Sequence, residues 1–469
     1  MKTNGSAKRV LSVITMTAVV IVIIYFITAH LLEDKNVISK SQIQRIRERG
    51  YLLAATDKNT LNYFIYRGEA MGYQLELLES FAHYLGVPLR LIACDNISRM
   101  EYYLTYRAAD IIALNLPVSS KGENHAHFTH SFGETKLVVV QRQASSRASL
   151  HELEGDTIYV RANPFMTSLY DLIKSEGNNH IVLHEVADTS QTDLVRMVSE
   201  GSIPFTLCEQ NLAIVMQRAY TNLNVGLEVS EPFEYAWSTY NKSDSLATML
   251  NSWIDSIQES RKMRKIYTLY FESQKTTGFL TGKYSSILSH SISPYDREIM
   301  SYSKIIGWDW RLIASLMYEE SNFLQGQVSH HSASGLMQMV PETAEKFGLD
   351  STSGPAHQIA AGIKYLKWID KQLPDEIIDQ RERVSFILAS YNVGIGRVLA
   401  LRKKASHYGK DPNRWHGHVE YYLLKRSRKD PYAKSDAMSV FPVNYSTEGY
   451  VDGIVARYLH YRNLIPIKP

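Results

Sequence analysis

The pattern of hydrophobic residues changes once along this chain of 469 residues, near residue 290, and that change limits the possible folds more than any other feature. From about 41 to 272, short runs rich in β-branched and aromatic residues alternate with longer runs whose apolar residues recur at i, i+3 and i+4. Such alternation predicts an α/β fold with a largely parallel sheet, and roughly 230 residues suffice for two lobes.

The individual segments can be assigned by this pattern. Strands are predicted at YLLAAT (51–56), LRLIACD (89–95), AADIIALN (108–115), KLVVVQRQ (136–143), DTIYVRA (156–162), IVLHEV (181–186), IPFTLCEQ (203–210) and LNVGLEV (223–229). Helices are predicted at 73–86, 166–177, 192–201 and 246–260. The bilobal α/β domain is therefore expected to span 41–272.

The remainder of the chain contains no convincing strand. Residues 273–290 are rich in Ser, Thr, Gly and Lys and weakly periodic, which predicts an interdomain linker. From 291 to 469 the apolar residues follow a helical period, beginning at Ser293-Pro294, which is a helix start signal. We expect this part to form a separate all-α domain.

The N-terminus predicts a membrane segment. Val10 to Leu32 contains no Lys, Arg, Asp or Glu and exceeds the roughly 20 residues that a membrane helix needs. Basic residues precede this run and Glu33 and Asp34 follow it, so residues 1–33 are expected to form a cytoplasmic tip and a signal-anchor helix. A cleaved signal peptide is the alternative, and it would leave the mature chain peripheral on the outer membrane.

Charge and cysteine content limit the partners and the redox chemistry. The net charge of +3 gives no argument for nucleic-acid binding in a chain of this size. Only Cys94 and Cys208 occur, and each lies in a strand-like apolar run. Two buried structural thiols are favoured over a disulfide, although an extracytoplasmic disulfide would be permitted.

Two adjacent glutamates end a predicted helix in the C-terminal part. Glu320 shares a helical face with the apolar residues Ile313, Leu316 and Met317, whereas Glu319 faces a slightly more polar side. Burial on an apolar face raises the pKa of a carboxyl group towards neutrality, as a general acid requires. The alternative is that both glutamates are exposed at a frayed helix end.

The residues around this pair resemble the lytic transglycosylase family, which cleaves peptidoglycan with a lysozyme-like helical domain. The sequence EES-x-F is followed by S-x-x-x-A-x-G-L-M-Q-M-x-P-x-T-A within 319–344. Three further family-like segments follow in order, AGIKYLKWI (361–369), ASYNVGIGRV (389–398) and EGYVDGIVARYLHY (448–461). Four ordered motifs make the resemblance specific over roughly 291–465.

This resemblance implies a mechanism with one carboxylate. Glu320 would protonate the bond between N-acetylmuramic acid and N-acetylglucosamine and then accept the proton of the muramyl O6, producing a 1,6-anhydro end. Ser329, Gln338 and Tyr391 would line the cleft, with Asn392 tied to the loop backbone. One departure is Ser332, where the family usually has Gly; a positive φ there would cost backbone energy.

The first domain resembles periplasmic amino-acid-binding domains of solute-binding protein family 3. YRGEAMGYQLELL (66–78) carries their Gly-aromatic-x-x-acidic-Leu element, with Glu76 where Asp is usual. Where such domains have a Thr and an Arg that clamp the ligand carboxylate, this chain has Ser119 and Gly122. Glu209 falls where an acidic group would meet a ligand ammonium. The implied ligand is an amino acid or a muropeptide, with Glu76 and Glu209 as candidate contacts.

The order of the three parts resembles membrane-bound lytic murein transglycosylases, which implies a periplasmic enzyme that acts on peptidoglycan glycan strands. A non-catalytic sensor of the wall or of muropeptides is the alternative. No cofactor and no metal are expected, because His330-His331 and His416-x-His418 lack a third ligand at a recognisable spacing. The sequence leaves exo or endo action, the choice of membrane and the ligand of the first domain open.

Overall fold

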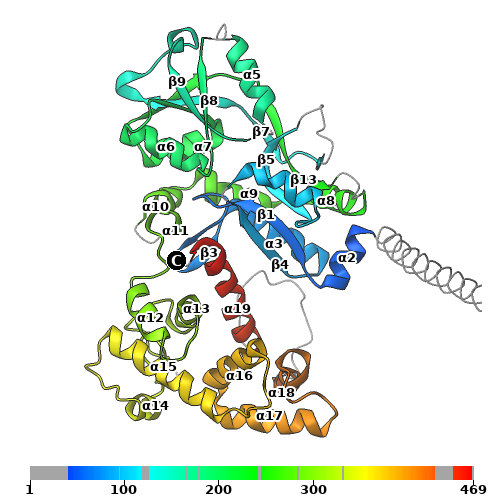
Figure 1. Ribbon diagram of the computed structural model, residues 1–469, viewed down its shortest axis with the longest axis vertical. Coiled ribbons are helices and arrows are strands. Elements are labelled where there is room, and N and C mark those ends of the chain that lie inside the picture. The colour runs from blue at the N-terminus through cyan, green and yellow to red at the C-terminus, as the bar shows by residue number, and fades with distance from the viewer. Residues whose placement is uncertain are drawn as a thin grey trace, which may run out of the picture.

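The computed structural model describes residues 41–94, 96–118, 126–163, 166–176, 180–240, 244–282, 285–329, 332–427 and 447–466. Two α/β lobes and a helical domain follow one another along the long axis of the molecule (Figure 1). The predicted membrane segment, 1–33, lies outside the described residues. Within the described part, no helix combines the length and the apolar character that crossing a membrane requires.

Lobe 1 is built on a sheet of order β4-β1-β5-β13-β6, with β7 also paired to β13. Its strands are β1 (Leu52–Asp57), β4 (Leu89–Cys94), β5 (Ile111–Pro117), β6 (Ala126–Phe128), β7 (Gly133–Thr135) and β13 (Phe233–Tyr240). Strand β1 runs parallel to β4 and β5, and β13 returns antiparallel to β5. Its helices are α2 (Gln42–Arg49), α3 (Tyr73–Leu85), α4 (Met100–Thr105), α8 (Asp244–Ile257) and α9 (Arg261–Tyr267).

Lobe 2 carries the second sheet, of order β10-β9-β11-β8-β12. Its strands are β8 (Leu137–Arg142), β9 (Thr157–Arg161), β10 (Val182–Val186), β11 (Phe205–Glu209) and β12 (Leu223–Glu228). Its helices are α5 (Thr167–Glu176), α6 (Gln191–Glu200) and α7 (Gln210–Ala219). Strands β9, β10 and β11 are parallel, whereas β8 and β12 are antiparallel additions.

The predicted two-lobed α/β fold is confirmed, and all eight predicted strands are present. The sequence analysis missed β13, although this strand is central to the lobe 1 sheet. It follows Pro232 and reads FEYAWSTY, and the structure buries residues 235–239 without a break, on both faces of the sheet. Cys94 and Cys208 are both buried and free, as predicted.

The segment 273–290, expected as a linker, contains two short helices, α10 (Lys275–Thr281) and α11 (Ser286–Ser289). Phe279 packs against Phe64 and Tyr66, with ring centroids 5.6 Å and 5.1 Å apart. Ser286 accepts a hydrogen bond from Ile65 N at 2.9 Å. The connection is therefore packed onto lobe 1 through its few apolar residues. The polar residues between them obscure the helical period in the sequence, which is why a linker was expected.

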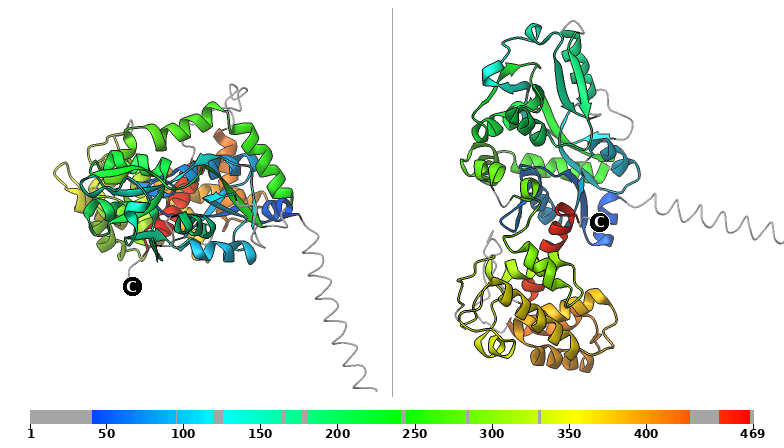
Figure 2. Two further views of the ribbon diagram at one scale, coloured as in Figure 1. Left: turned by 90° about the horizontal axis from the view of Figure 1, so that it is seen from above. Right: turned by 60° about the vertical axis from the view of Figure 1, so that its left-hand side comes forward.

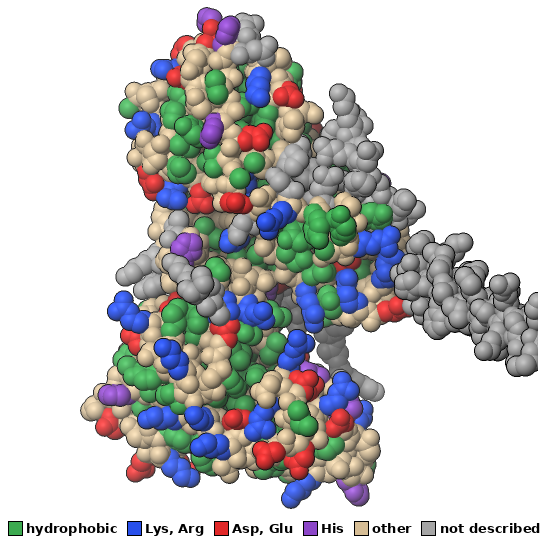
Figure 3. All heavy atoms as spheres, viewed as in Figure 1, with side chains coloured by type: hydrophobic (Ala, Val, Ile, Leu, Met, Phe, Trp, Pro, Cys, Tyr) green, Lys and Arg blue, Asp and Glu red, His purple; other side chains and the backbone are tan. Residues whose placement is uncertain are grey.

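The C-terminal part is all-α, as predicted. Its helices are α12 (Asp296–Ser303), α13 (Trp310–Ser321), α14 (Pro341–Lys346), α15 (Pro355–Gln372), α16 (Gln380–Val393), α17 (Ile395–His407), α18 (Glu420–Ser427) and α19 (Thr447–Leu464), with a kinked turn at Trp415–Val419. Helix α13 packs on α19, and both helices contribute to the same hydrophobic core. Basic and acidic side chains are mixed over the visible face of this domain (Figure 3).

Lobe 1 and the helical domain share a packed interface. The last turns of α19 lie against β4 and against the hairpin of β2 (Phe64–Tyr66) and β3 (Glu69–Met71), as Figures 1 and 2 show. Tyr461 OH donates to Gly68 O at 2.5 Å. Gly68 has φ +86°, and a Cβ there would lie 2.4 Å from a ring carbon of Phe323. The hairpin thus reaches the loop that follows α13.

Candidate active site

Helix α13 places the glutamate pair at its C-terminal end. Asp309 caps its N-terminus by accepting a hydrogen bond from Arg311 N at 3.0 Å. Asn322 ends the helix in the left-handed region, at φ 48°, which Asn tolerates better than most residues. Most residues between these caps are buried, so the direction of the two glutamate side chains is fixed by packing of the whole helix.

Glu320 is half-buried, and its carboxylate accepts a very short hydrogen bond from Tyr450 OH of α19. Burial raises the pKa of Glu320 to about 8; the Tyr450 hydrogen bond opposes this rise and the nearby Glu319 adds to it. Among the described residues, no cationic side chain forms an ion pair with Glu320. Its carboxyl group is therefore largely protonated at neutral pH, as proton donation requires.

Glu319 has a different environment. Its side chain is 3% exposed and pairs with Arg457 of α19 at 2.9 Å. The Arg457 guanidinium also lies over the Tyr318 ring, 4.4 Å from its centroid. Burial raises the pKa of Glu319, and Arg457 opposes the rise. The sequence predicts that Glu319 lies on the slightly more polar face of the helix, and the structure places Arg457 on that face, from a helix more than a hundred residues later.

The predicted substrate-contacting residues surround the loop between α13 and α14. Gln338 has φ 43°, and its amide donates to Gln327 O at 2.8 Å and to Gly335 O at 2.9 Å. Tyr391 of α16 donates to Met337 O at 2.7 Å. Burial, followed by the charge of Glu320, raises the pKa of Tyr391. Gln338 and Tyr391 are thus brought to the same loop.

The other two predicted contacts are exposed. Ser329 Oγ accepts from Ala333 N at 3.1 Å, and Asn392 lies at the exposed end of α16. Ser332 has φ 59°, so the residue that stands at the usual Gly position does adopt the left-handed conformation. Ser321, which follows the glutamates, is buried with its Oγ 2.8 Å from Leu336 O. It joins α13 to the loop, as expected of a helix-end residue.

The sequence analysis missed Tyr450 and Arg457. Both lie in EGYVDGIVARYLHY, which was recognised as a family segment but assigned no role. They are seven residues apart, which places them on one face of a helix. That spacing is the signal that could have paired this helix with the two glutamates.

The second site is a cavity of about 60 Å³ between the two lobes. Asp57 and Asn115 line it from lobe 1, and Arg161 and Glu209 line it from lobe 2. Arg161 pairs with Asp57 at 2.7 Å, and Asn115 donates to Glu209 at 2.9 Å. Burial raises the pKa of Glu209 to about 7, and the Asn115 hydrogen bond opposes the rise.

The other residues that the sequence suggested for this cavity are not among its described lining residues. Glu76 is not among the lining residues; its Oε1 accepts from Tyr270 OH at 2.6 Å, on the side of α3 that faces the π-helical segment Thr268–Glu272. Ser119 and Gly122 lie outside the described residues. Arg161 was missed by the sequence analysis because the expected arginine belongs to lobe 1, whereas this one ends strand β9 of lobe 2.

Two family models match the chain. The model described as Transglycosylase SLT domain matches residues 299–414, and the model described as Bacterial extracellular solute-binding proteins, family 3, matches 52–273. An amino acid ABC transporter substrate-binding protein of Streptococcus pneumoniae, solved with L-arginine, is 15% identical with a TM-score of 0.44, over 50% of this chain and 98% of that one.

Curated relatives match over both domains. The membrane-bound lytic murein transglycosylase F of Stutzerimonas stutzeri is 30% identical over 400 residues, which are 84% of this chain and 82% of that protein. The protein of the same name from Desulfosudis oleivorans is 27% identical over 394 residues, 83% of this chain and 86% of that protein. The family models and the relatives thus define a lytic murein transglycosylase with an N-terminal solute-binding domain. The chain belongs to the membrane-bound lytic murein transglycosylase F family.

Proposed function

We propose that Glu320 is the single acid and base of a reaction that cleaves the β-1,4 bond between N-acetylmuramic acid and N-acetylglucosamine. The observation that carries the proposal is the contrast within the glutamate pair. Glu320 is held protonated by burial, and its hydrogen-bond partner among the described residues is the Tyr450 phenol, whereas Glu319 is bound to Arg457. A neutral carboxyl group can donate a proton to the departing sugar oxygen.

The environment of Glu319 argues against hydrolysis. Glycosidases that use water or a covalent intermediate need a second carboxylate, about 5–10 Å from the first, as base or nucleophile. The carboxylate whose charge acts on Glu320, that of Glu319, is buried and engaged by the Arg457 guanidinium. The muramyl C6 hydroxyl then serves as the nucleophile. Because it belongs to the same sugar as the carbon it attacks, it is held close to that carbon and does not need the activation that a free water molecule needs. The product carries a 1,6-anhydro end.

Substrate contacts are proposed at the loop beside the acid. Gln338 and Tyr391 are fixed by hydrogen bonds to backbone carbonyls of one loop, and this holds the Gln338 Oε1 and the Tyr391 hydroxyl oxygen in place as acceptors. Ser329 and Asn392 are exposed at its border and suit contacts with acetamido or hydroxyl groups. Peptidoglycan glycan strands are the substrate class.

The decisive experiment uses Glu320→Gln, which keeps the shape of the side chain and removes the titratable proton. The full chain is incubated with purified murein, and the products are analysed by mass spectrometry. The wild-type protein is expected to release products with 1,6-anhydro ends and without reducing muramic acid, and Glu320→Gln none. Mainly reducing ends would overturn the proposal, because water would then be the nucleophile.

For the first domain, we propose an amino-acid or muropeptide ligand in the cavity between the lobes, with Glu209 as its acidic contact. The Arg161–Asp57 pair supplies both charges that a zwitterionic ligand would meet, so a ligand must displace this pair. Calorimetry on the full chain with free amino acids and with stem peptides tests the proposal. Heat that disappears in Glu209→Gln supports it, and equal heat in the variant refutes it.

We also propose that residues 1–33 anchor the protein in a membrane, with both described domains in the periplasm. The uncharged run and its basic flank support this, together with the relatives that are named membrane-bound. Recovery of the full chain in membranes, and loss of that association in a chain that begins near residue 34, would be expected. A cleaved N-terminus in the mature protein would favour the signal-peptide alternative.

A further inference from the structure

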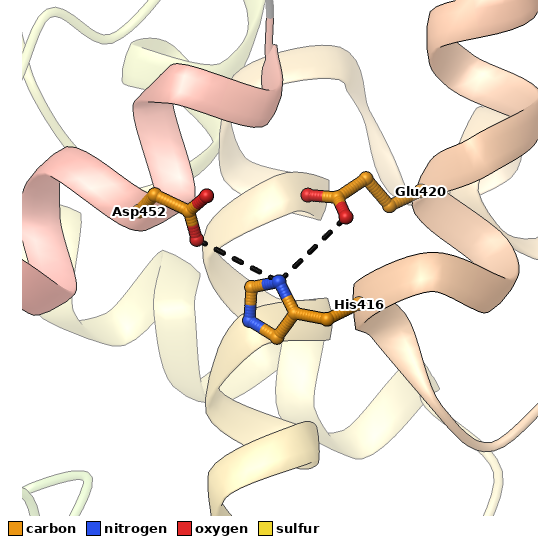
Figure 4. Close-up of side chains that lie close together, drawn as sticks. All are labelled: His416, Glu420 and Asp452. Atoms are coloured by element: carbon orange, nitrogen blue, oxygen red, sulfur yellow. Dashed lines mark ion pairs between the residues drawn. The ribbon is translucent and has the colours of Figure 1, made fainter. Parts of the chain in front are cut away.

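Three side chains that the proposed reaction does not use meet where α19 begins. His416 lies in the kinked, non-helical turn before α18, Glu420 begins α18, and Asp452 lies in the first turns of α19. His416 Nδ1 lies 3.6 Å from Glu420 Oε2 and 3.6 Å from Asp452 Oδ1. One potential ligand atom of each residue lies within 4.8 Å of the others, and Figure 4 shows the three groups facing one another.

Glu420 is the unusual member of this cluster. Its side chain is 8% exposed, and its Oε1 has no hydrogen-bond partner among the described residues. Its Oε2 accepts only a long bond, 3.3 Å, from Gly417 N. Figure 4 shows the carboxylate directed towards His416 and Asp452. A buried carboxylate oxygen without a partner is costly, so the position of Glu420 requires a group that is not a neighbouring side chain.

The spacing fits a metal ion better than a hydrogen-bonded cluster. A separation of 3.6 Å is too long for a hydrogen bond. In a tetrahedral site with bonds of about 2.0–2.1 Å, ligand atoms are about 3.3–3.4 Å apart, so the two separations from His416 need only a small shift, and the two carboxylates can close on a cation by side-chain rotation. Two carboxylates match the charge of a divalent cation. An imidazole nitrogen disfavours Ca²⁺ and Mg²⁺, which prefer oxygen ligands only.

We propose that His416, Glu420 and Asp452 bind a divalent transition-metal cation, with Zn²⁺ as the best fit and water in the remaining positions. His418, although next to the cluster in sequence, is not a ligand, because its Nδ1 accepts a hydrogen bond from Asp411 N at 3.0 Å. No metal is expected from the sequence alone, because no third ligand lies at a recognisable spacing from the histidines. Asp452 is brought to the site only by the packing of α19.

The site also connects to the proposed acid. Asp452 lies two residues after Tyr450, whose hydroxyl is bonded to Glu320. A cation that joins Asp452 to the start of α18 would hold the first turns of α19, and with them Tyr450, against α13. This consequence rests on the proposed role of Glu320, whereas the binding of the cation does not. The cation is thus a positioning group and not part of the reaction.

Binding is tested with the full chain, prepared without a polyhistidine tag and stripped with a chelator. Zn²⁺ is titrated against a chromophoric competitor, with Mn²⁺, Ca²⁺ and Mg²⁺ in parallel. We expect one equivalent of Zn²⁺ to bind, at least tenfold more weakly in His416→Ala and Asp452→Asn, and unchanged in the matched control His418→Ala. Equal binding by the wild type and His416→Ala would overturn the proposal, as would equal weakening in His418→Ala.

A second readout does not depend on activity. Zn²⁺ is expected to raise the thermal midpoint of the wild type and of Glu320→Gln, and to leave that of His416→Ala unchanged, because a ligand that binds only the folded state stabilises it. Chelation should then slow the release of anhydro products by the wild type several-fold and leave the rate of Asp452→Asn unchanged. A zinc-dependent midpoint with a chelator-insensitive rate would refute the positioning of Tyr450 while leaving the metal site intact.

Discussion

The Tyr450 hydroxyl donates a hydrogen bond to the carboxyl group of Glu320. Tyr450 belongs to α19, a helix that begins more than a hundred residues after Glu320 in the chain. The same helix supplies Arg457 to Glu319, and its last turns contact the hairpin of lobe 1. Helix α19 therefore determines the different states of the two glutamates and joins their domain to the solute-binding domain.

Removing the Tyr450 hydroxyl should affect the acid directly. In Tyr450→Phe the pKa of Glu320 should rise further, because the lost hydrogen bond opposes the effect of burial. We expect kcat to fall about ten- to a hundredfold through loss of positioning, and the alkaline limb of the pH profile to move to higher pH. Tyr458→Phe is the matched control, since Tyr458 OH bonds to Asp309 on the same helix pair. Identical profiles for both variants would contradict this role.

Activity and stability should both depend on the protonation of Glu320. Its pKa is raised from 4.5 to about 8 in the folded protein, so the proton is bound more tightly after folding. The associated stability is fully present below about pH 4.5 and is lost as the pH rises through about 8. The free energy of unfolding of Glu320→Gln, relative to that of the wild type, should therefore increase by about 1–3 kcal/mol from pH 5 to pH 9. This range is discounted for the partial exposure of the side chain. Unfolding curves at both pH values measure this difference.

The rate should follow the same titration. Because the protonated carboxyl group is the donor, kcat/KM is expected to fall as the pH rises through about 8. A pH profile of anhydro-product release provides the measurement. A rate that increases through pH 8 would mean that the ionised form of Glu320 is the reactive one.

The Glu319–Arg457 pair should contribute mainly to stability. Arg457→Met leaves a carboxylate that is 3% exposed without its cation, and we expect a loss of about 2–4 kcal/mol. Glu319→Gln should cost less and keep most of the activity, because Gln can still accept a hydrogen bond from Arg457. Combining both changes should recover part of the loss. Denaturant unfolding of the two single variants and the double variant tests the coupling.

Ser332→Gly should stabilise the loop before the Gly-Leu-Met-Gln segment. Ser332 has φ 59°, a conformation that costs a residue with a Cβ about 1–2 kcal/mol. The greater freedom of Gly in the unfolded chain offsets part of this gain, so about 0.5–1 kcal/mol should remain. Thermal unfolding measures the effect. The same change at Ser334, which has no positive φ, is the control and should destabilise.

Sequence periodicity was sufficient for the two-lobed α/β domain, for the all-α C-terminal part and for placing Glu320 on an apolar helical face. Each of these depends on local patterns, namely β-rich runs, a helical apolar stripe and a carboxylate on that stripe. The family-like segment 448–461 lies within α19.

Tertiary structure decided the chemistry around that carboxylate. Tyr450 and Arg457 act on the glutamates only because α19 packs across α13, and Asp452 meets His416 for the same reason. The ion pair in the cavity between the lobes also depends on tertiary structure, because Asp57 comes from lobe 1 and Arg161 comes from lobe 2. A residue's partner across such distances depends on how helices and lobes pack, and neither periodicity nor spacing within one segment records that packing.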